Sequence, residues 1–290
     1  MTSNDPPSGA SSGIRAAQAS RRDVARRRAR VLAGVCVAGA LVLAGCSSSS
    51  SSTPASGSTA AAGKISGKVV VFAATSLTDA FDKIGAQFEK ANPGVTVTFN
   101  YNGSSSLATS ITQGAPADVF ASAAPANMKT VTDAGDAVGT PQIFTRNTAE
   151  IMVETGNPLK IKSVSDLANP KVKVVVCAPE VPCGAVAQAV FKNAGVTVKP
   201  VSEETNVGGV VTKVTLGEAD AGIVYVTDVK ANESKAAGVP IPASQNDITE
   251  YPIVQVKGAP NSSAAKAFID YVLGPTGQQV LASFGFLPPG

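Results

Sequence analysis

The sequence predicts an α/β fold for the part of this 290-residue chain that follows position 63. Strand-like apolar runs alternate with amphipathic, helix-like runs from there to the C-terminus, which is typical of a sheet covered by helices. Glycine and proline mark the joints between these runs, as at Asn92-Pro93-Gly94. The 227 residues from Lys64 to Gly290 suffice for one large domain or two smaller ones.

The expected strands are short runs rich in the β-branched and aromatic residues that fit a pleated sheet. The run from Val69 to Phe72 is continuously apolar, and Val95 to Phe99 alternates between apolar residues and threonine. In chain order, the expected strands are Lys68–Ala73, Val95–Asn100, Asp118–Ala121, Ile151–Glu154, Val172–Cys177, Ala221–Val226 and Tyr251–Val256.

The expected helices show apolar residues at helical spacing. Phe81, Ile84 and Phe88 give the clearest example, because positions three, four and seven apart lie on one helix face. In chain order, the expected helices are Leu77–Ala91, Ser106–Gln113, Ala124–Ala134, Ser165–Ala168, Gly184–Ala194, Val207–Leu216, Val226–Asn232, Ser263–Leu273 and Gly277–Phe284.

Residues 1–45 are interpreted as an export signal. Seven arginines precede the uncharged apolar run Val31–Ala44, which is too short to span a membrane but typical of a signal-peptide core. The run ends in Leu43-Ala44-Gly45-Cys46, which resembles the bacterial lipobox. This resemblance implies that Cys46 receives a diacylglyceryl group and becomes the first mature residue; an uncleaved anchor is the alternative.

Residues 46–63 are rich in serine, alanine and glycine, so they predict a flexible tether that spans roughly 20–25 Å. The signal contains seven of the 24 basic residues and two of the 21 acidic ones, which leaves the mature chain near a net charge of −2. No basic patch for nucleic acid remains. The chain has no histidine, which excludes a Ser-His-Asp triad.

Two serines follow strands at the start of helices. Ser76 ends the first strand, and Ser104 comes two residues after Asn102 at the end of the second. Each serine alone is explained by helix capping, and Ser76-Leu77-Thr78-Asp79 fits a capping box. Two such starts near each other favour an oxyanion site, since helix N-termini present unbonded N–H groups and a positive dipole.

Cys177 and Cys183 are the mature cysteines besides Cys46. An even pair in an exported chain predicts a disulfide, and without histidine two thiols do not complete a zinc site. Ser263 and Lys266 match the Ser-x-x-Lys of some serine enzymes, but the accompanying motifs are missing, so this is interpreted as coincidence. Asp118 and Asp220 are expected to make structural hydrogen bonds.

Six ordered motifs give the chain a family resemblance over about Lys68 to Pro288. It resembles the molybdate-binding proteins of ABC transporters, a branch of the periplasmic-binding superfamily. The motifs are Val71-Phe-Ala-Ala-Thr-Ser76-Leu77-Thr78, Gly103-Ser-Ser-Ser-Leu107-Ala108, Gly114-Ala-Pro-Ala-Asp118-Val119-Phe120, Val181-Pro-Cys183-Gly184, Gly222-Ile-Val-Tyr225 and Glu250-Tyr251-Pro252.

The resemblance implies a two-lobed fold of type II, with two chain crossovers and the ligand in the cleft between the lobes. Lobe one is expected at residues 64–143 and 252–290, and lobe two at residues 144–251. Neutral donors would hold a tetrahedral dianion. Carried over, these are the hydroxyl and backbone N–H groups of Ser76 and Ser104, the backbone N–H groups of Cys183 and Val207, and the phenol of Tyr225. The family usually has alanine at the Cys183 position.

The resemblance also implies a monomeric binding protein, not an enzyme, without cofactor or directly bound metal ion. It would capture molybdate or tungstate at the outer face of the cytoplasmic membrane, anchored at Cys46, and deliver it to an ABC permease with its ATPase. A sulfate binder, an exported serine hydrolase with a lysine base, and a module that docks a partner through the Cys177–Cys183 loop are the alternatives.

Overall fold

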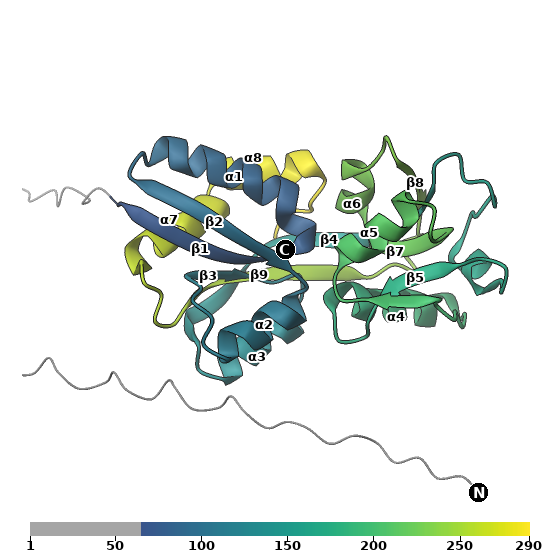
Figure 1. Cartoon of the computed structure of the whole chain (residues 1–290), viewed down its shortest axis with the longest axis horizontal. Helices are drawn as coiled ribbons and strands as arrows, with labels where there is room; N and C mark the ends of the chain where they lie inside the picture. The colour runs from purple at the N-terminus through teal and green to yellow at the C-terminus, as the bar shows by residue number, and fades with distance from the viewer. Residues whose placement is uncertain (1–64) are drawn as a thin grey trace, which may run out of the picture. The chain divides into compact units, whose positions relative to one another are not determined.

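A computed structural model describes residues 65–290, which fold into two lobes (Figure 1). The export signal, the lipidation of Cys46 and the tether were predicted for residues that lie outside the described part. No helix among residues 65–290 is long and apolar enough to cross a membrane.

The first lobe is a five-stranded sheet with helices on both faces. Its strand order is β2-β1-β3-β9-β4, in which β1 pairs in parallel with β2 and β3, while β9 runs antiparallel to β3 and β4. The strands are β1 (Gly67–Ala74), β2 (Val95–Asn102), β3 (Val119–Ala121), β4 (Ala137–Glu154) and β9 (Ile248–Val256). The helices are the 3₁₀ turn η1 (Thr75–Leu77), α1 (Thr78–Ala91), α2 (Ser104–Thr112), α3 (Pro125–Asp133), α7 (Ser262–Leu273) and α8 (Pro275–Phe284).

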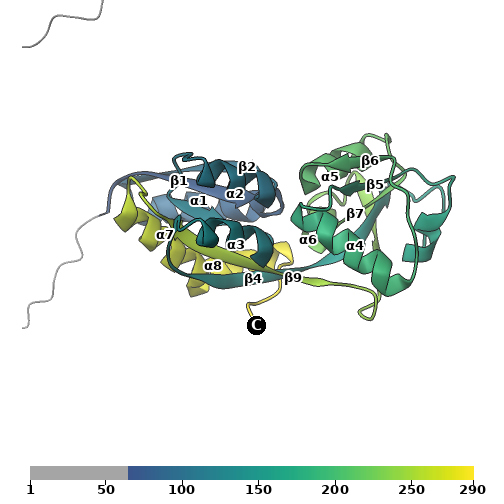
Figure 2. The same cartoon turned by 90° about the horizontal axis from the view of Figure 1, so that it is seen from below.

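Two apolar clusters hold the first lobe together, one on each face of the sheet. Under α1, α7 and α8, the rings of Phe81, Phe88 and Phe268 meet edge to face, with centroids 5.4–6.1 Å apart. Under α2 and α3, Leu107 and Phe120 lie in the second cluster. Figure 1 shows α1 and α8 above the sheet and α2 and α3 below it, and Figure 2 looks onto the lobe from the side of α2 and α3.

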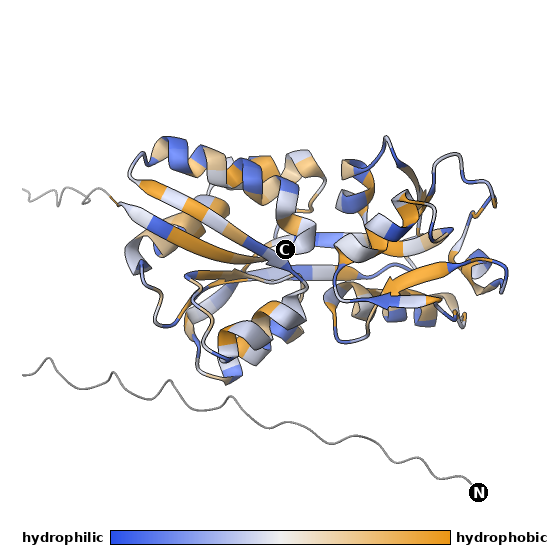
Figure 3. Ribbon diagram, in the orientation of Figure 1, coloured by the Kyte–Doolittle hydropathy of each residue, from blue (hydrophilic) through white to orange (hydrophobic). Residues whose placement is uncertain are grey.

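The second lobe continues the sheet as β4-β7-β5-β6, with β8 paired on β4. Its strands are β5 (Val174–Cys177), β6 (Ser202–Glu204), β7 (Ala221–Tyr225) and β8 (Ala236–Pro240). Its helices are the 3₁₀ helix η2 (Val164–Ala168), α4 (Pro182–Ala194), α5 (Val207–Thr215) and α6 (Val226–Ala231). Figure 3 shows β5 as a hydrophobic strand, and all four of its residues are buried, as expected for the interior of an α/β sheet.

The lobes are joined by β4 and β9, which lie side by side and cross between them (Figure 1). The first half of β4 pairs with β9, and its second half pairs with β7 and β8. The predicted α/β class with two chain crossovers is therefore confirmed.

Three strand predictions were wrong. The strand expected at Ile151–Glu154 begins at Ala137. The first half of this strand is polar and contains proline, and it is a strand because it pairs with β9, through a ladder with two register shifts. The strands β6 and β8 were missed, since Ser-Glu-Glu and Ala-Ala-Gly-Val-Pro carry little strand propensity. Long-range pairing with β5 and β4 overrides that local preference.

Candidate anion-binding site

All five residues predicted to bind the anion line one pocket between the lobes. They come from five separate segments: the 3₁₀ turn η1, the start of α2, the start of α4, the start of α5 and the end of β7. The full lining is Ala74, Thr75, Ser76, Asn102, Gly103, Ser104, Ala123, Val181, Pro182, Cys183, Asn206, Val207 and Tyr225. Its volume is about 10 Å³, close to the roughly 10–15 Å³ that one water needs, so the lobes enclose little free space at this point.

Three helices, α2, α4 and α5, begin at the pocket. The first N–H groups of a helix have no partner within the helix and carry its positive dipole end. No side chain caps α2 or α4, and Asn206 caps α5 through the N–H of Gly209, not that of Val207. Pro182 is the first residue of α4 and has no N–H, so Cys183 supplies the first amide of that helix.

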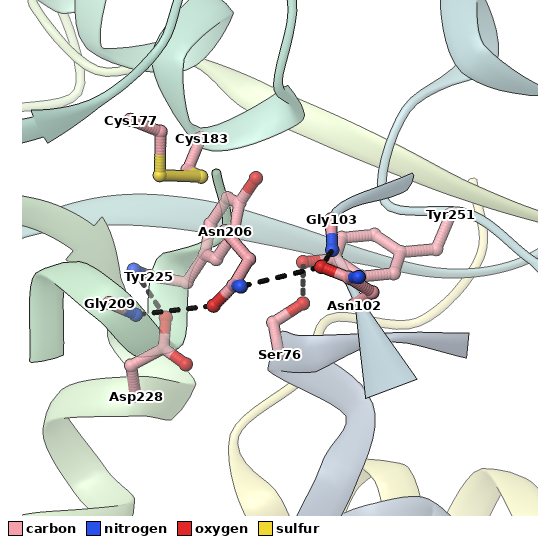
Figure 4. The surroundings of a disulfide bond; sticks show 10 residues. All are labelled: Ser76, Asn102, Gly103, Cys177, Cys183, Asn206, Gly209, Tyr225, Asp228 and Tyr251. Carbon is pink, nitrogen blue, oxygen red and sulfur yellow. Dashed lines mark hydrogen bonds between the residues drawn. A yellow bond between two sulfur atoms is a disulfide. The ribbon is translucent and has the colours of Figure 1, made fainter. Parts of the chain in front are cut away.

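Ser76 does not cap a helix, although its sequence fits a capping box. The segment Thr75–Leu77 forms a 3₁₀ turn, and α1 starts at Thr78 without a side-chain cap. The Ser76 hydroxyl instead lies 2.9 Å from the hydroxyl of Tyr251 (Figure 4). The side chain is therefore oriented by the strand β9 rather than by its own helix.

Ser104 also has a different role from the predicted cap. It is the first residue of α2, with Gly103 at the cap position, and its side chain is 1% exposed. Its hydroxyl accepts a hydrogen bond from the N–H of Ala123 at 2.9 Å. Because that bond uses only a lone pair, the hydroxyl proton remains available for a ligand.

Tyr225 presents a buried hydroxyl without a hydrogen-bond partner among residues 65–290. Burial raises the pKa of this phenol well above its usual value, so the group keeps its proton and acts as a donor at neutral pH. Since buried polar groups are nearly always paired, an orphan of this kind in a pocket wall indicates a missing acceptor. Thr75 Oγ1, another lining atom, is also buried and unpaired within the same residues.

The backbone of Tyr225 is held by Asp228. The Tyr225 N–H donates to Asp228 Oδ2 at 2.9 Å, which caps α6. Burial raises the pKa of Asp228 to about 7, although this hydrogen bond acts in the opposite direction. The carboxylate lies behind the pocket wall and does not line the pocket.

The structure contains the disulfide expected between Cys177 and Cys183, whose Cα atoms are 5.6 Å apart. It ties the end of β5 to the first turn of α4 (Figure 4). The next residue, Gly184, is packed tightly as well, because a Cβ at this position would overlap the Ala178 carbonyl. The amide of Cys183 is thus fixed by a covalent bond and by close packing.

The pocket is electrically neutral. None of its lining residues is a lysine, arginine, aspartate or glutamate. Arg146 donates through Nε to the carbonyl of Pro288, outside the lining. The donors available to a ligand are therefore neutral: hydroxyls, backbone amides and the side-chain amides of Asn102 and Asn206.

The lobes touch beside the pocket. Asn206 Nδ2 of the second lobe donates to Asn102 Oδ1 of the first at 3.4 Å (Figure 4). A Cβ on Gly103 would overlap the Thr205 carbonyl oxygen across the same boundary. The sequence analysis gave no role to Asn102, Asn206 or Tyr251. Tyr251 was visible there only as part of the motif Glu250-Tyr251-Pro252.

The other singled-out residues lie away from the pocket. Asp118 accepts from the N–H groups of Val70 and Asn261, and Asp220 accepts from that of Lys173, as expected for structural carboxylates. Lys266 is exposed and pairs with Asp270 four residues on in α7. The Ser-x-x-Lys match is therefore a surface feature of a helix.

The sequence profile of a family described as bacterial extracellular solute-binding protein matches residues 69–287. The chain is 43% identical over 252 residues to the molybdate-binding protein ModA of Mycobacterium tuberculosis, covering 86% of this chain and 95% of the relative. It is 33% identical over 231 residues to ModA of Escherichia coli, covering 76% and 89%. It is 30% identical over 251 residues to the putative ABC transporter substrate-binding lipoprotein YvgL of Bacillus subtilis, covering 85% and 93%.

Solved structures give the same fold. A periplasmic molybdate-binding protein of Azotobacter vinelandii superposes with a TM-score of 0.68 at 20% identity, covering 77% of this chain and 100% of that one. The substrate-binding domain of a putative molybdenum ABC transporter from Clostridium difficile has a TM-score of 0.58 at 29% identity, covering 76% and 98%. The predicted two-lobed binding-protein fold is confirmed.

Proposed function

Because the chain belongs to the family of bacterial extracellular solute-binding proteins, we propose that its pocket captures molybdate or tungstate for an ABC permease. The chain is a binding protein and not an enzyme. Its 43% identical relative is a molybdate-binding protein. The observation that carries the proposal is the orphan phenol of Tyr225 in a neutral pocket where three helices begin.

Five residues are proposed to hold the anion. Ser76 and Ser104 donate from the first lobe through their hydroxyl and backbone N–H groups. Cys183 and Val207 donate backbone N–H groups, and Tyr225 donates its phenol, from the second lobe. Hydrogen bonds to an ionised acceptor are about twice as strong as neutral ones, so neutral donors suffice for a dianion.

The donor set also supports a choice among oxyanions. Molybdate, tungstate and sulfate are fully deprotonated near neutral pH, whereas phosphate retains a proton that requires an acceptor. No carboxylate lines the pocket, which disfavours phosphate. Sulfate has the same charge and shape, so its rejection rests on size: donors fixed for a larger anion leave its hydrogen bonds too long.

Delivery is proposed to depend on lobe closure. An anion that contacts both lobes favours the closed arrangement over the open one, and the permease recognises the closed form. The proposed lobes comprise residues 64–143 with 252–290, and residues 144–251. The chain is proposed to act as a monomer.

We further propose that the protein is anchored by a diacylglyceryl group on Cys46 at the outer face of the cytoplasmic membrane. The lipobox-like sequence before Cys46 supports this, as does the 30% identity to a putative lipoprotein. Two acyl chains are enough for stable retention. The unaltered protein should incorporate labelled fatty acid and a Cys46→Ala variant should not, whereas an unlabelled unaltered protein would contradict the anchor.

Calorimetric titration of the purified protein with molybdate, tungstate, sulfate and phosphate at equal ionic strength tests the function. We expect one-to-one binding of molybdate and tungstate and no heat from sulfate or phosphate. Binding of sulfate with comparable affinity would make the chain a general tetrahedral-dianion binder. Silence from all four anions would reject the oxyanion function.

A further inference from the structure

Tyr251 has a buried hydroxyl that contacts the candidate site without lining it. The side chain is fully buried at 0% exposure, and its hydroxyl lies 2.9 Å from Ser76 Oγ. Either oxygen can be the donor from geometry alone. The direction of this hydrogen bond decides what Ser76 offers to a ligand.

A bound anion would select one direction of this hydrogen bond. Burial raises the pKa of Tyr251 above its usual value, so its phenol keeps its proton at neutral pH. A serine hydroxyl has a single proton and two lone pairs. If Ser76 donated to Tyr251, only lone pairs would face the pocket and repel an anion. If Tyr251 donates, the Ser76 proton is free to point into the pocket.

The position of the Tyr251 hydroxyl is set by packing. Its ring meets those of Phe144, Tyr225 and Phe286 edge to face, with centroids 5.6–6.3 Å apart. Its backbone pairs with Thr145 where β9 and β4 cross between the lobes. The ring therefore has little freedom to carry its hydroxyl away from Ser76. Figure 4 draws the two side chains and the hydrogen bond between them.

We propose that Tyr251 is a positioning residue that donates to Ser76 and thereby directs the Ser76 hydroxyl proton toward the bound oxyanion. The chain of donors runs from Tyr251 to Ser76 to the anion. Hydrogen bonds in such a chain polarise one another, so the Ser76 bond to the anion is strengthened. This proposal rests on the proposed oxyanion-binding function.

A double-mutant cycle on the full-length protein tests it. Tyr251→Phe removes one oxygen and keeps the ring, and it should raise the molybdate Kd about tenfold, the value of one hydrogen bond of about 1.4 kcal/mol. In a Ser76→Ala background the same substitution should change Kd less than twofold, because Tyr251 then has no hydroxyl to direct. Tyr101→Phe is the matched control. The Tyr101 hydroxyl donates to Asp82 Oδ1 at 2.7 Å and does not line the pocket, so the molybdate Kd of this variant should be unchanged.

A purely structural role gives a different result. An equal rise in Kd in both backgrounds would place the effect in packing and overturn the proposal, as would an unchanged Kd for Tyr251→Phe alone. Urea unfolding without ligand tests the hydrogen bond itself on the unaltered protein, the two single variants and the double variant. The two substitutions should be non-additive in the free energy of unfolding, and additive effects would count against the bond. If the unaltered protein binds no oxyanion, the proposed function fails first and this inference falls with it.

Discussion

The substitution Gly103→Ala should impair closure of the lobes on a ligand without impairing the folding of either lobe. Gly103 has φ −60° and ψ 137°, a conformation that alanine adopts without strain. The added Cβ would overlap the carbonyl oxygen of Thr205 in the other lobe. Because that oxygen belongs to the backbone, the two lobes must separate locally to make room.

The expected consequence is weaker binding without loss of the fold. Overpacking of this kind costs about 1–3 kcal/mol, and here the cost applies only when the lobes are closed on the ligand. The molybdate Kd should rise about 5- to 150-fold, while the melting temperature of the ligand-free protein stays within about 2 °C. Calorimetric titration and thermal unfolding with and without molybdate measure the two quantities.

Gly184→Ala provides the contrast. Its Cβ would overlap the Ala178 carbonyl within the second lobe itself, so this variant should lose stability even without ligand. If Gly103→Ala binds molybdate as tightly as the unaltered protein, the contact with Thr205 is not part of the bound state and the closure argument is wrong. If it destabilises the ligand-free protein as strongly as Gly184→Ala does, the contact is part of the fold instead.

Three further outcomes are expected. Replacing Cys177 and Cys183 together by serine should lower the free energy of unfolding by about 2 kcal/mol, seen as a lower urea midpoint; equal midpoints would show that the disulfide adds nothing. Asp228 has a pKa of about 7 in the folded state. Between about pH 4 and pH 7 its carboxyl is therefore protonated in the folded protein but ionised in the unfolded chain. The free energy of unfolding should therefore fall as pH rises through that window, by up to about 4 kcal/mol. Urea unfolding at pH 5 and pH 8 should show a smaller difference for Asp228→Asn than for the unaltered protein, and equal differences would exclude Asp228 as the source. Lys266→Ala should leave the molybdate Kd unchanged in calorimetry, because the exposed ion pair of Lys266 with Asp270 lies on a helix surface. Weakened binding would show that Lys266 contributes to the site after all.

Helices were predictable from the sequence because their signal is local. Each expected helix overlaps an observed one, and Gly184–Ala194 was placed two residues late because proline at position 182 begins the helix rather than preceding it. Strands depend on partners far along the chain. The first half of β4 carries a left-handed Gly139 and polar residues, so only its pairing with β9 makes it a strand.

The residues proposed for the site could be chosen from the sequence, whereas their contacts could not. The motifs around Ser76 and Ser104 mark helix starts, and the structure brings both to one pocket. Helix capping would have explained each serine taken alone, yet the Ser76 hydroxyl contacts Tyr251, 175 residues away, and the Ser104 hydroxyl accepts from Ala123. No local pattern reports such a contact, because it arises only when two strands of one sheet end near each other.

The pairing of β4 with β9 has a mechanical consequence. The two connections between the lobes form one antiparallel ribbon, so they cannot slide past each other independently and must bend or twist together. Pro252, opposite Ile143, has no N–H to contribute to this ladder, and a register shift follows between Ile143 and Thr145. The ladder between the lobes is thus interrupted one residue from Tyr251, whose hydroxyl contacts Ser76.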